Sequence, residues 1–457
     1  MGKSLKRLQK KRKLNEINKI FSANQNSEQC NSFQELGITD EDLKSTLKVL
    51  AHLNKSSNFN NQEFFSVKKE IFNIVQNSQL EKNNKINLKI TNLLEEKHFN
   101  KAIFQLKLNY LNNIKLGTVQ RWIRLASLNN SITARTNEES TEYYRLLDMI
   151  IRVSDPSQIF ALEDSEDFHM EYPSLRRFQP FLIPVNSVID NKATDTSNMN
   201  DLKCSSNLNF NFKLLISEKN LKMETHIKIF TLDNSISHDI FDQNYHYDRM
   251  IKKLTLPFVQ KSFILTNVFT KRECENLLIA SDSIGYVDDF GYSFSPDASE
   301  GAAGCVWLME DNLMNPIFER VKQLLPQELN DKALTGLNAR FRFYRYSKNA
   351  LYRPHVDGSW PGSGLVNGEY KFDKFGNQWS CLTFLIYLNQ DFDGGETSFF
   401  WPSTGEGILN VKGVKPSQGC VLVFPHGDTS GALIHEGSQV TDGFKYVIRT
   451  DVLYEKI

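Results

Sequence analysis

Two histidines and an aspartate near the C-terminal end of the chain have the spacing of ligands for a divalent metal ion. His355 and Asp357 stand two residues apart in the segment YRPHVDG, and His435 follows later in ALIHEGSQV. Residues two apart on an extended chain project to the same side, so an imidazole and a carboxylate can reach one ion. Two histidines and one carboxylate form the facial set of non-haem iron enzymes, which leaves other metal positions open.

A lysine further along the chain predicts which molecule shares this metal. Lys445 lies ten residues beyond His435 and opens the apolar run KYVIRTDVLY. A buried cation at this place can hold the distal carboxylate of 2-oxoglutarate while the keto-acid end of that molecule chelates the metal. The ordered set of HxD, histidine and cation is more specific than any of its members, and it predicts 2-oxoglutarate as the cosubstrate.

A second HxD pattern, His426-Gly427-Asp428 in the segment FPHGD, competes for the role of metal site. If it supplied two ligands, His435 would have to be the third from a tight loop. His355 and Asp357 would then have no role. We therefore interpret FPHGD mainly as turn chemistry.

The segments that must position these residues have the pattern of short strands. They are ARFRFYRY, CLTFLIYLN, GCVLVF and KYVIRTDVLY, separated by turns rich in Gly, Pro and Asp. Ahead of them we expect a strand at 262–269, a helix that begins at the capping box Thr270–Glu273, and a helix NPIFERVKQLL with Pro316 near its first turn. This order predicts an α+β fold with a sandwich or barrel of strands braced by helices on one side.

The chain divides by composition into four parts. Residues 1–34 are basic and then polar, which predicts a disordered tail. Residues 35–155 have a mainly helical pattern, and residues 156–256 form a connecting region with a polar insertion at 186–210. The catalytic domain spans 257–457, with its core at 335–455. The helical pattern rests on Leu43, Leu47 and Leu50, on Ile103, Leu106, Leu108 and Leu111, and on a buried face of LGTVQRWIRLA made by Val119, Trp122, Ile123 and Ala126.

Charge and cysteine usage limit the classes of partner and compartment. The 457 residues carry 54 basic and 54 acidic side chains, so the whole chain gives no electrostatic argument for a nucleic-acid or membrane partner. Residues 1–20 are basic, which indicates a nuclear signal, a nucleic-acid contact or the solvated start of a helix. No secretory or membrane-spanning segment follows. Six scattered cysteines predict free thiols in the cytoplasm or nucleus. The sequence leaves the oligomeric state open.

From residue 257 to its end, the chain resembles the prolyl 4-hydroxylase-like branch of the 2-oxoglutarate/Fe(II) oxygenases. Within that branch it is most similar to a group from plants, fungi and protists. The resemblance is carried by YRPHVDG, LTFLIYLN, GGET, FPHGD, LIHEGS and KYVIRTDVLY, and more weakly by LGTVQRWIR and LLDMIIR. It implies a double-stranded β-helix (jelly-roll) core with Fe(II) bound by His355, Asp357 and His435.

The same resemblance implies roles for the residues around the metal. Tyr346 would donate a hydrogen bond to 2-oxoglutarate, Lys445 would pair with its distal carboxylate, and Thr383 would support it. Tyr352 would face the substrate. Asn349 stands where the family has glycine, a mild departure because Asn tolerates left-handed geometry better than other residues with a side chain.

Three further residues near the site have two interpretations each. Arg449 lies on the same strand face as Lys445, so it either lines the cavity or forms a structural ion pair. Trp360 and Trp379 either wall the pocket or pack in the core. Lysine as the cation is typical of collagen-type prolyl hydroxylases, and the paired arginines of nucleic-acid demethylases are not found.

The resemblance implies that O2 and 2-oxoglutarate are converted to succinate and CO2 while a substrate C–H is hydroxylated, with ascorbate keeping the iron reduced. Our first hypothesis for the substrate is a peptidyl residue, of prolyl type, in an intracellular protein. A second hypothesis replaces the protein with nucleic acid or a small molecule, and only the basic N-terminus supports it. A third makes the chain an inactive oxygenase domain that binds partners.

Overall fold

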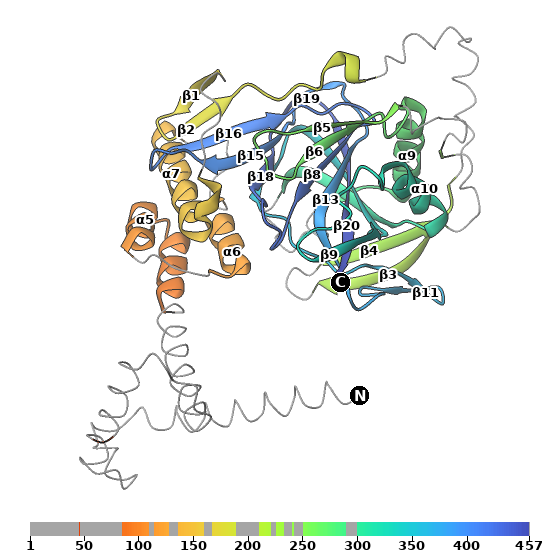
Figure 1. Cartoon of the computed structure of the whole chain (residues 1–457), viewed down its shortest axis with the longest axis horizontal. Coiled ribbons are helices and arrows are strands. Elements are labelled where there is room, and N and C mark those ends of the chain that lie inside the picture. Colours follow the sequence, from red (N-terminus) through yellow and green to blue (C-terminus); the bar gives the residue numbers. More distant parts are fainter. Residues whose placement is uncertain are drawn as a thin grey trace, which may run out of the picture. The chain divides into compact units, whose positions relative to one another are not determined.

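The protein is described by a computed structural model at residues 45, 85–108, 114–127, 136–159, 167–188, 210–220, 225–232, 240–241, 250–288 and 299–456. Residues 82–457 form one compact unit (Figure 1). The predicted basic tail, Leu111, and the helical pattern of Leu43, Leu47 and Leu50 lie outside the described residues. The division of the chain into four parts stays a prediction.

Two runs of antiparallel strands that share one long strand form the centre of this unit. The first run contains, in order, β10 (Arg340–His355), β20 (Lys445–Lys456), β13 (Gln378–Tyr387) and β17 (Val421–Pro425). The second run contains β10 again, then β18 (Ile434–Gly437), β15 (Thr397–Pro402) and β16 (Leu409–Val414). All six pairings are antiparallel.

Strand β10 serves both runs because it changes direction near its middle. Its first half pairs with β20 up to Tyr346, and its last residues pair with β18. Between the halves, Asn349 adopts a φ of 70°. This left-handed conformation is easier for Asn than for other residues with a side chain, which confirms what its place in the family's glycine position predicted.

Shorter strands extend both runs. β8 (Ser299–Leu308) lies beside β10, and β6 (Phe263–Thr266) and β5 (Lys252–Thr255) continue beyond β17. β2 (Leu175–Phe178) lies parallel to β16 and pairs with β1 (Phe168–Tyr172), and β3 (Phe212–Asn220) and β4 (Thr225–Leu232) form a hairpin next to β8. The other strands are β7 (Val287–Asp288), β9 (Lys332–Leu337), β11 (Gly364–Val366), β12 (Glu369–Lys371), β14 (Phe392–Gly394) and β19 (Val440–Gly443). The connecting region therefore contributes strands to the sheet.

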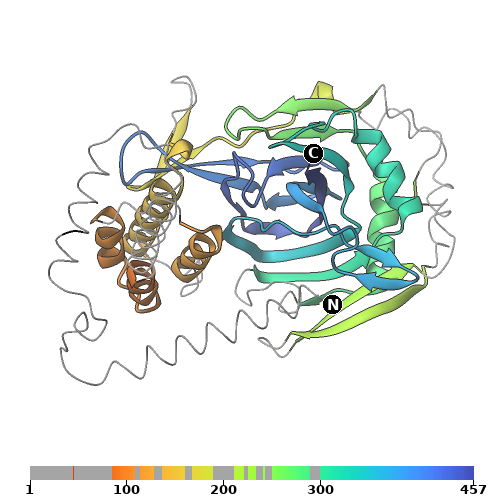
Figure 2. The ribbon, with the colours of Figure 1, turned by 60° about the horizontal axis from the view of Figure 1, so that its bottom comes forward.

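Two helices cover the outer face of the first run (Figure 2). α9 (Lys271–Ile284) begins at the predicted capping box of Thr270 and Glu273, which is confirmed. α10 spans Asp311–Val321, so Pro316 lies in its second turn instead of near its first. The prediction was wrong because the helix begins ahead of the proline, on the acidic segment that precedes it. Both helices share a core with the outward side chains of β10, Phe341 and Phe343.

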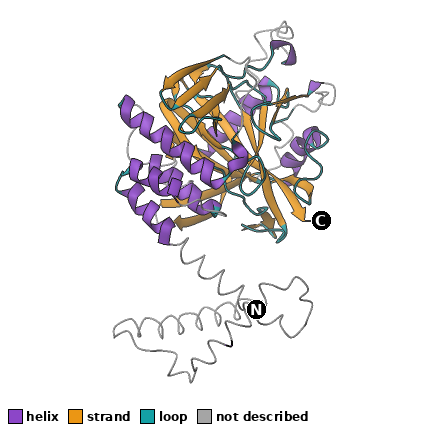
Figure 3. Ribbon diagram, turned by 60° about the vertical axis from the view of Figure 1, so that its left-hand side comes forward, coloured by secondary structure: helices purple, strands orange, loops and turns teal. Residues whose placement is uncertain are grey.

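Helices cover the second run on the other side of the molecule (Figure 3). They include the helical residues 85–95, α5 (Phe99–Leu108), α6 (Leu116–Ser127) and α7 (Asn137–Ser154). Their buried side chains, including the predicted face Val119, Trp122, Ile123 and Ala126, share a core with Leu175, Phe400, Leu409, Val411 and Ile434. Ile103 and Leu106 are buried as predicted, but Leu108 is 63% exposed. Two residues beyond Leu106, its side chain lies about 200° around the helix axis.

The described residues test two predictions, that the cysteines are free thiols and that the chain has no membrane-spanning helix. Cys274, Cys305, Cys381 and Cys420 are buried free thiols, as predicted. Among the same residues, every helix is too short or too polar to span a bilayer.

Candidate metal centre

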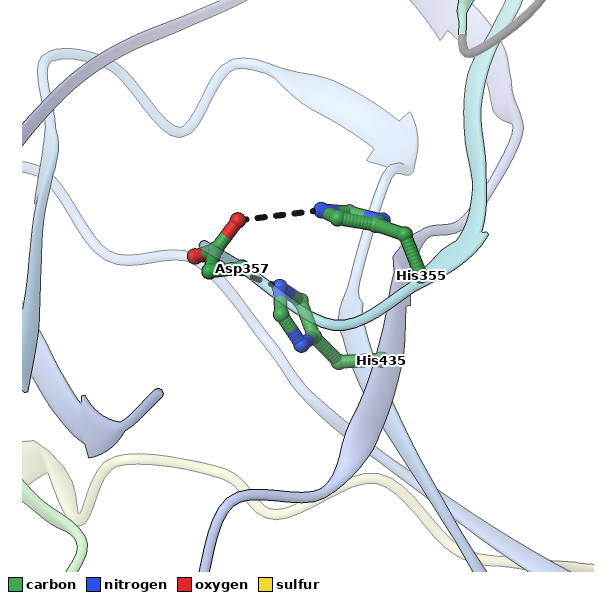
Figure 4. A group of neighbouring side chains, drawn as sticks. All are labelled: His355, Asp357 and His435. Carbon is green, nitrogen blue, oxygen red and sulfur yellow. Dashed lines mark ion pairs between the residues drawn. The ribbon is translucent and has the colours of Figure 1, made fainter. Parts of the chain in front are cut away.

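The three predicted metal ligands come together where β10 ends. His355 is the last residue of β10 and lies directly opposite His435 of β18 in the antiparallel register. Asp357 follows on the segment that leaves the strand. Nε2 of His355 lies 3.2 Å from Oδ1 of Asp357, and Nε2 of His435 lies 3.6 Å from Oδ2. One donor atom from each residue falls within 4.8 Å of the others (Figure 4).

Backbone carbonyl groups fix the orientation of both imidazoles. Nδ1 of His355 lies 2.7 Å from the carbonyl oxygen of Arg353, and Nδ1 of His435 lies 3.2 Å from that of Leu433. A carbonyl oxygen only accepts hydrogen bonds, so each Nδ1 carries the proton and each Nε2 offers its lone pair. Burial, with His435 nearby, lowers the pKa of His355. The pKa shift favours the neutral imidazole that a metal requires.

Asp357 is a buried carboxylate that the protein holds in its charged form. Its Oδ1 lies 2.8 Å from Nη1 of Arg449, and its Oδ2 accepts a hydrogen bond of 2.6 Å from the Thr383 hydroxyl. Burial alone would raise the pKa of this carboxyl group, but Arg449 and the two imidazoles hold it well below its usual range. Arg449 also lines the pocket, so both interpretations of this residue hold.

The histidine of the second HxD motif contacts the aspartate of the first through Thr383. His426 is 1% exposed, with Nδ1 2.8 Å from the Thr383 hydroxyl and Nε2 2.8 Å from the Ser380 hydroxyl. Because Thr383 donates its proton to Asp357, it must accept from Nδ1–H of His426. Nε2 of His426 then accepts from Ser380. These proton positions follow from the carboxylate of Asp357, which can only accept hydrogen bonds. The series of hydrogen bonds from Ser380 to Asp357 fixes the orientation of this carboxylate at the candidate metal centre.

The turn that carries His426 has a backbone reason for its glycine. Gly427 has a φ of 61°, and its N–H donates a hydrogen bond of 2.9 Å to the carbonyl oxygen of Asp357. A Cβ at this position would lie 3.0 Å from Cβ of Ser359. The turn directs Asp428 into solvent. The interpretation of FPHGD as a turn holds for the backbone, but we missed the buried role of His426, which its place directly after the apolar run GCVLVFP could have indicated.

The residues predicted to contact 2-oxoglutarate and substrate line the same pocket as the metal ligands. The pocket is lined by Tyr344, Tyr346, Tyr352, His355, Asp357, Thr383, Leu385, Thr397, Phe424, His435, Glu436, Gly437, Lys445, Val447 and Arg449. These residues come from both strand runs, so the pocket lies between the runs. Trp360 and Trp379 are not among them. Trp379 is instead 42% exposed, and Trp360 contacts arginine side chains.

Lys445 is a buried ammonium group at one end of the pocket. It is 3% exposed, and Nζ donates a hydrogen bond of 2.7 Å to the carbonyl oxygen of Gly395. The ring of Tyr346 lies 5.2 Å from Nζ. Burial lowers the pKa of Lys445 to about 8, although Glu396 opposes the shift. A group this poorly solvated has a strong electrostatic preference for an incoming carboxylate.

Helix α6 holds the segment that carries the metal ligands, which the sequence did not predict. The side-chain amide of Gln120 donates a hydrogen bond of 2.9 Å to the carbonyl oxygen of Val356, the residue between His355 and Asp357. In the opposite direction, Arg353 donates one of 2.8 Å to the carbonyl oxygen of Ser127. The helical region is therefore in direct contact with the backbone of the candidate metal centre.

Comparison with known sequences finds similarity to oxygenases. Residues 341–450 match the family model of the 2OG-Fe(II) oxygenase superfamily. A protein of Acanthamoeba polyphaga mimivirus, named as a proposed prolyl 4-hydroxylase, is 28% identical over 194 residues, which cover 41% of this chain and 72% of that protein.

Comparison with solved structures finds prolyl hydroxylases at low identity. The viral collagen prolyl hydroxylase of Paramecium bursaria Chlorella virus-1, solved with 2OG, is 14% identical with a TM-score of 0.29, and the alignment covers 43% of this chain and 97% of that one. A prolyl-4-hydroxylase of Pseudomonas putida is 16% identical with a TM-score of 0.28, covering 42% and 91%. At these TM-scores the structural alignments carry no argument about the fold or the function of this chain.

Proposed function

We propose, from the premise that residues 341–450 belong to the 2OG-Fe(II) oxygenase superfamily, that this chain is a dioxygenase that hydroxylates a peptidyl residue of prolyl type. The observation that carries the proposal is the cluster of His355, Asp357 and His435, which opens into the pocket that also contains Lys445. Two neutral imidazoles and one carboxylate suit ferrous iron. Bound Fe(II) would supply O2 activation, with 2-oxoglutarate as the reductant that leaves as succinate and CO2.

The strand order supports a double-stranded β-helix as the scaffold of this site. One run has the order β10, β20, β13 and β17, and the other has β10, β18, β15 and β16. Apart from the consecutive pair β15 and β16, the strands of the two runs alternate along the chain, and both runs contribute residues to the pocket. Such a scaffold places His355 and His435 on neighbouring strands, with Asp357 directly after the first of them.

The chain's own residues have distinct tasks in this proposal. Lys445 would bind the distal carboxylate of 2-oxoglutarate, with the hydroxyl of Tyr346 beside it. Thr383 would act through Asp357, because its hydroxyl proton already binds that carboxylate. Tyr352, whose ring lies 4.5 Å from that of His355, would face the substrate.

The choice of a peptidyl substrate draws on the mimivirus relative, which is named as a proposed prolyl 4-hydroxylase. It implies a protein partner and a requirement for ascorbate to keep iron reduced between turnovers. The complete ligand set, in which Asp357 and His435 are buried, supports an enzyme over an inactive binding module. The nucleic-acid alternative rested on the basic N-terminus, which lies outside the described residues.

The proposal is tested by measuring succinate formed from 2-oxoglutarate by the full chain with Fe(II) and ascorbate. We expect turnover in the wild type, even without substrate, and none in His355→Ala. Asp428→Asn, which changes an exposed side chain of the other HxD motif, is the matched control and should keep wild-type activity. Absence of both turnover and iron binding in the wild type would contradict the proposal. Mass spectrometry for added oxygen atoms in cellular proteins would then identify the substrate.

A further inference from the structure

Arg342 is a buried cation beside the candidate metal centre. It is 8% exposed, and its guanidinium carbon lies 4.8 Å from the centroid of the Trp360 ring. Within the part of the chain that the structure describes, it makes neither a hydrogen bond nor an ion pair. A guanidinium group packed by one face on an aromatic ring keeps the N–H donors at its edge available for an anion.

The position of Arg342 directs it toward the site. It lies two residues before Tyr344, which lines the pocket, so the two side chains share a face of β10. Directly across the strand pair from Arg342 is Arg449, which binds Asp357 at 2.8 Å. Cβ atoms of such opposed residues lie about 5 Å apart. The nitrogens of Arg342 are not among the enclosed polar atoms that lack a partner, so they stay open to solvent.

The acidic groups near Arg342 are already engaged. Asp357 binds Arg449 and would bind the metal. Asp451 lies 3.4 Å from Nη2 of Arg449 and 3.8 Å from Nδ1 of His426. Among the described residues, neither carboxylate forms an ion pair with Arg342, so its positive charge remains available to an incoming anion.

The chemistry of this subsite favours an anionic peptide over a nucleic acid. The planar guanidinium group can bind a carboxylate or a phosphate through two parallel hydrogen bonds. A nucleic-acid base would need a free aromatic face for stacking. The Trp360 ring is covered by Arg342 and has Phe372 packed against it at 5.7 Å in a T-shaped contact.

We propose that Arg342, held against Trp360, binds an anionic side chain of the substrate, a carboxylate or a phosphate, close in sequence to the residue that is hydroxylated. This substrate class rests on the proposed function as a peptidyl hydroxylase. Arg342 thereby selects peptides with an acidic or phosphorylated residue at a fixed distance from the target.

The test selects binders from a library of peptides with one fixed proline and random flanking residues. The full chain is loaded with Mn(II) and 2-oxoglutarate, and the bound pool is sequenced for wild type, Arg342→Gln and Arg345→Gln. Arg345 is the matched control because it lies on the opposite face of β10, with its guanidinium 4.8 Å from the Tyr286 ring. We expect Asp and Glu to be enriched about tenfold at one offset by wild type and Arg345→Gln, and not by Arg342→Gln.

The proposal is overturned if wild type enriches neither acidic nor phosphorylated residues, or if the enrichment survives in Arg342→Gln. A pool without any selected peptide would also overturn it, and succinate formation by the same preparation would then show that the oxygenase proposal still stands. Arg342→Lys, which keeps the charge without the planar fork, should retain a weaker preference and guards against misfolding of the glutamine variant.

Two further arms of the experiment identify the source of the anion. A library with phosphoserine beside the proline, compared with its glutamate equivalent, distinguishes a phosphate from a carboxylate in a peptide. A single-stranded oligothymidylate serves as the nucleic-acid probe. If it competes for the site more strongly than the selected peptides in an Arg342-dependent way, the peptide assignment is wrong.

Discussion

Two HxD motifs of the chain, at 355–357 and 426–428, have the same residue types and opposite fates. His355 and Asp357 both reach the candidate metal centre, whereas His426 turns into the core and Asp428 into solvent. The first motif continues an extended strand, so its two side chains lie on the same side. The second has Gly427 in a left-handed conformation, which separates them. Backbone geometry between the two residues, not their identity, decides which motif can bind metal.

The motifs are also coupled to each other. Thr383 binds Asp357 of the first motif and His426 of the second, and N–H of Gly427 binds the carbonyl oxygen of Asp357. The second motif thus acts as a support for the first. Substitutions in either motif, and acid, should therefore affect the ligand and its support differently.

Asp357→Asn should have the largest effect. It removes the only anionic ligand and leaves Arg449 buried beside a neutral amide. We expect metal affinity to fall more than about 100-fold, beyond what changes outside the ligands usually cause, and stability to fall by about 3–5 kcal/mol. Calorimetric titration with Mn(II) and denaturant unfolding measure the two effects. Retention of wild-type affinity would show that His426 and Asp428 hold the metal instead.

His426→Phe should have an intermediate effect. It leaves the hydroxyl groups of Thr383 and Ser380 without their buried partner. We expect a loss of stability of about 1–3 kcal/mol for each unsatisfied group and a 10- to 100-fold weaker metal affinity, because Asp357 loses a fixed donor. The same titration and unfolding experiments apply. A complete loss of metal binding in a well-folded variant would make His426 a ligand and contradict its role as a support.

Acid should destabilise the metal-free protein through both motifs. Burial lowers the pKa of His355 and of His426 from the usual 6.5, so below that pH the unfolded chain binds more protons than the folded chain. Stability therefore falls as pH falls from 6.5 toward the folded pKa of each imidazole, by at most about 1.4 kcal/mol per pH unit for each. His426→Gln should unfold with a shallower dependence on pH than wild type. An unchanged slope would show that His426 does not contribute.

Asp428→Asn should have the smallest effect. The side chain is exposed and ends the turn on the solvent side. We expect stability within about 0.5 kcal/mol of wild type and unchanged Mn(II) affinity. A loss of affinity comparable to that of Asp357→Asn would overturn the distinction between the two motifs.

The ligands and the main strands could be predicted because their signals are local. His355 and Asp357 share a face of an extended segment, and the apolar runs that became β10, β13, β17 and β20 are typical of buried strands. The capping box of Thr270 and the buried face of α6 are local patterns of the same kind. Their ends were less well predicted, since β10 runs nine residues past Tyr346, to His355.

The supporting contacts could not be predicted because they join distant segments. Gln120 lies 236 residues before Val356, whose carbonyl oxygen it binds, and Arg353 lies 226 residues after Ser127. Nothing in the local sequence of α6 distinguishes Gln120 from any half-buried polar side chain. The supporting role of His426 could not be predicted for the same reason, since its partner Thr383 lies on another strand.

The hydrogen bond from α6 to the backbone at Val356 shows that the region of sequence similarity and the independently folding unit have different boundaries. Similarity to the superfamily covers residues 341–450, but an excised fragment of that length would lose the partner of the Val356 carbonyl group. It would also leave the apolar wall around Phe400 and Val411 facing water, since helices α5 to α7 now cover it. The piece that folds on its own is therefore longer than the piece that is recognisably related, and a shortened gene should begin upstream of residue 85.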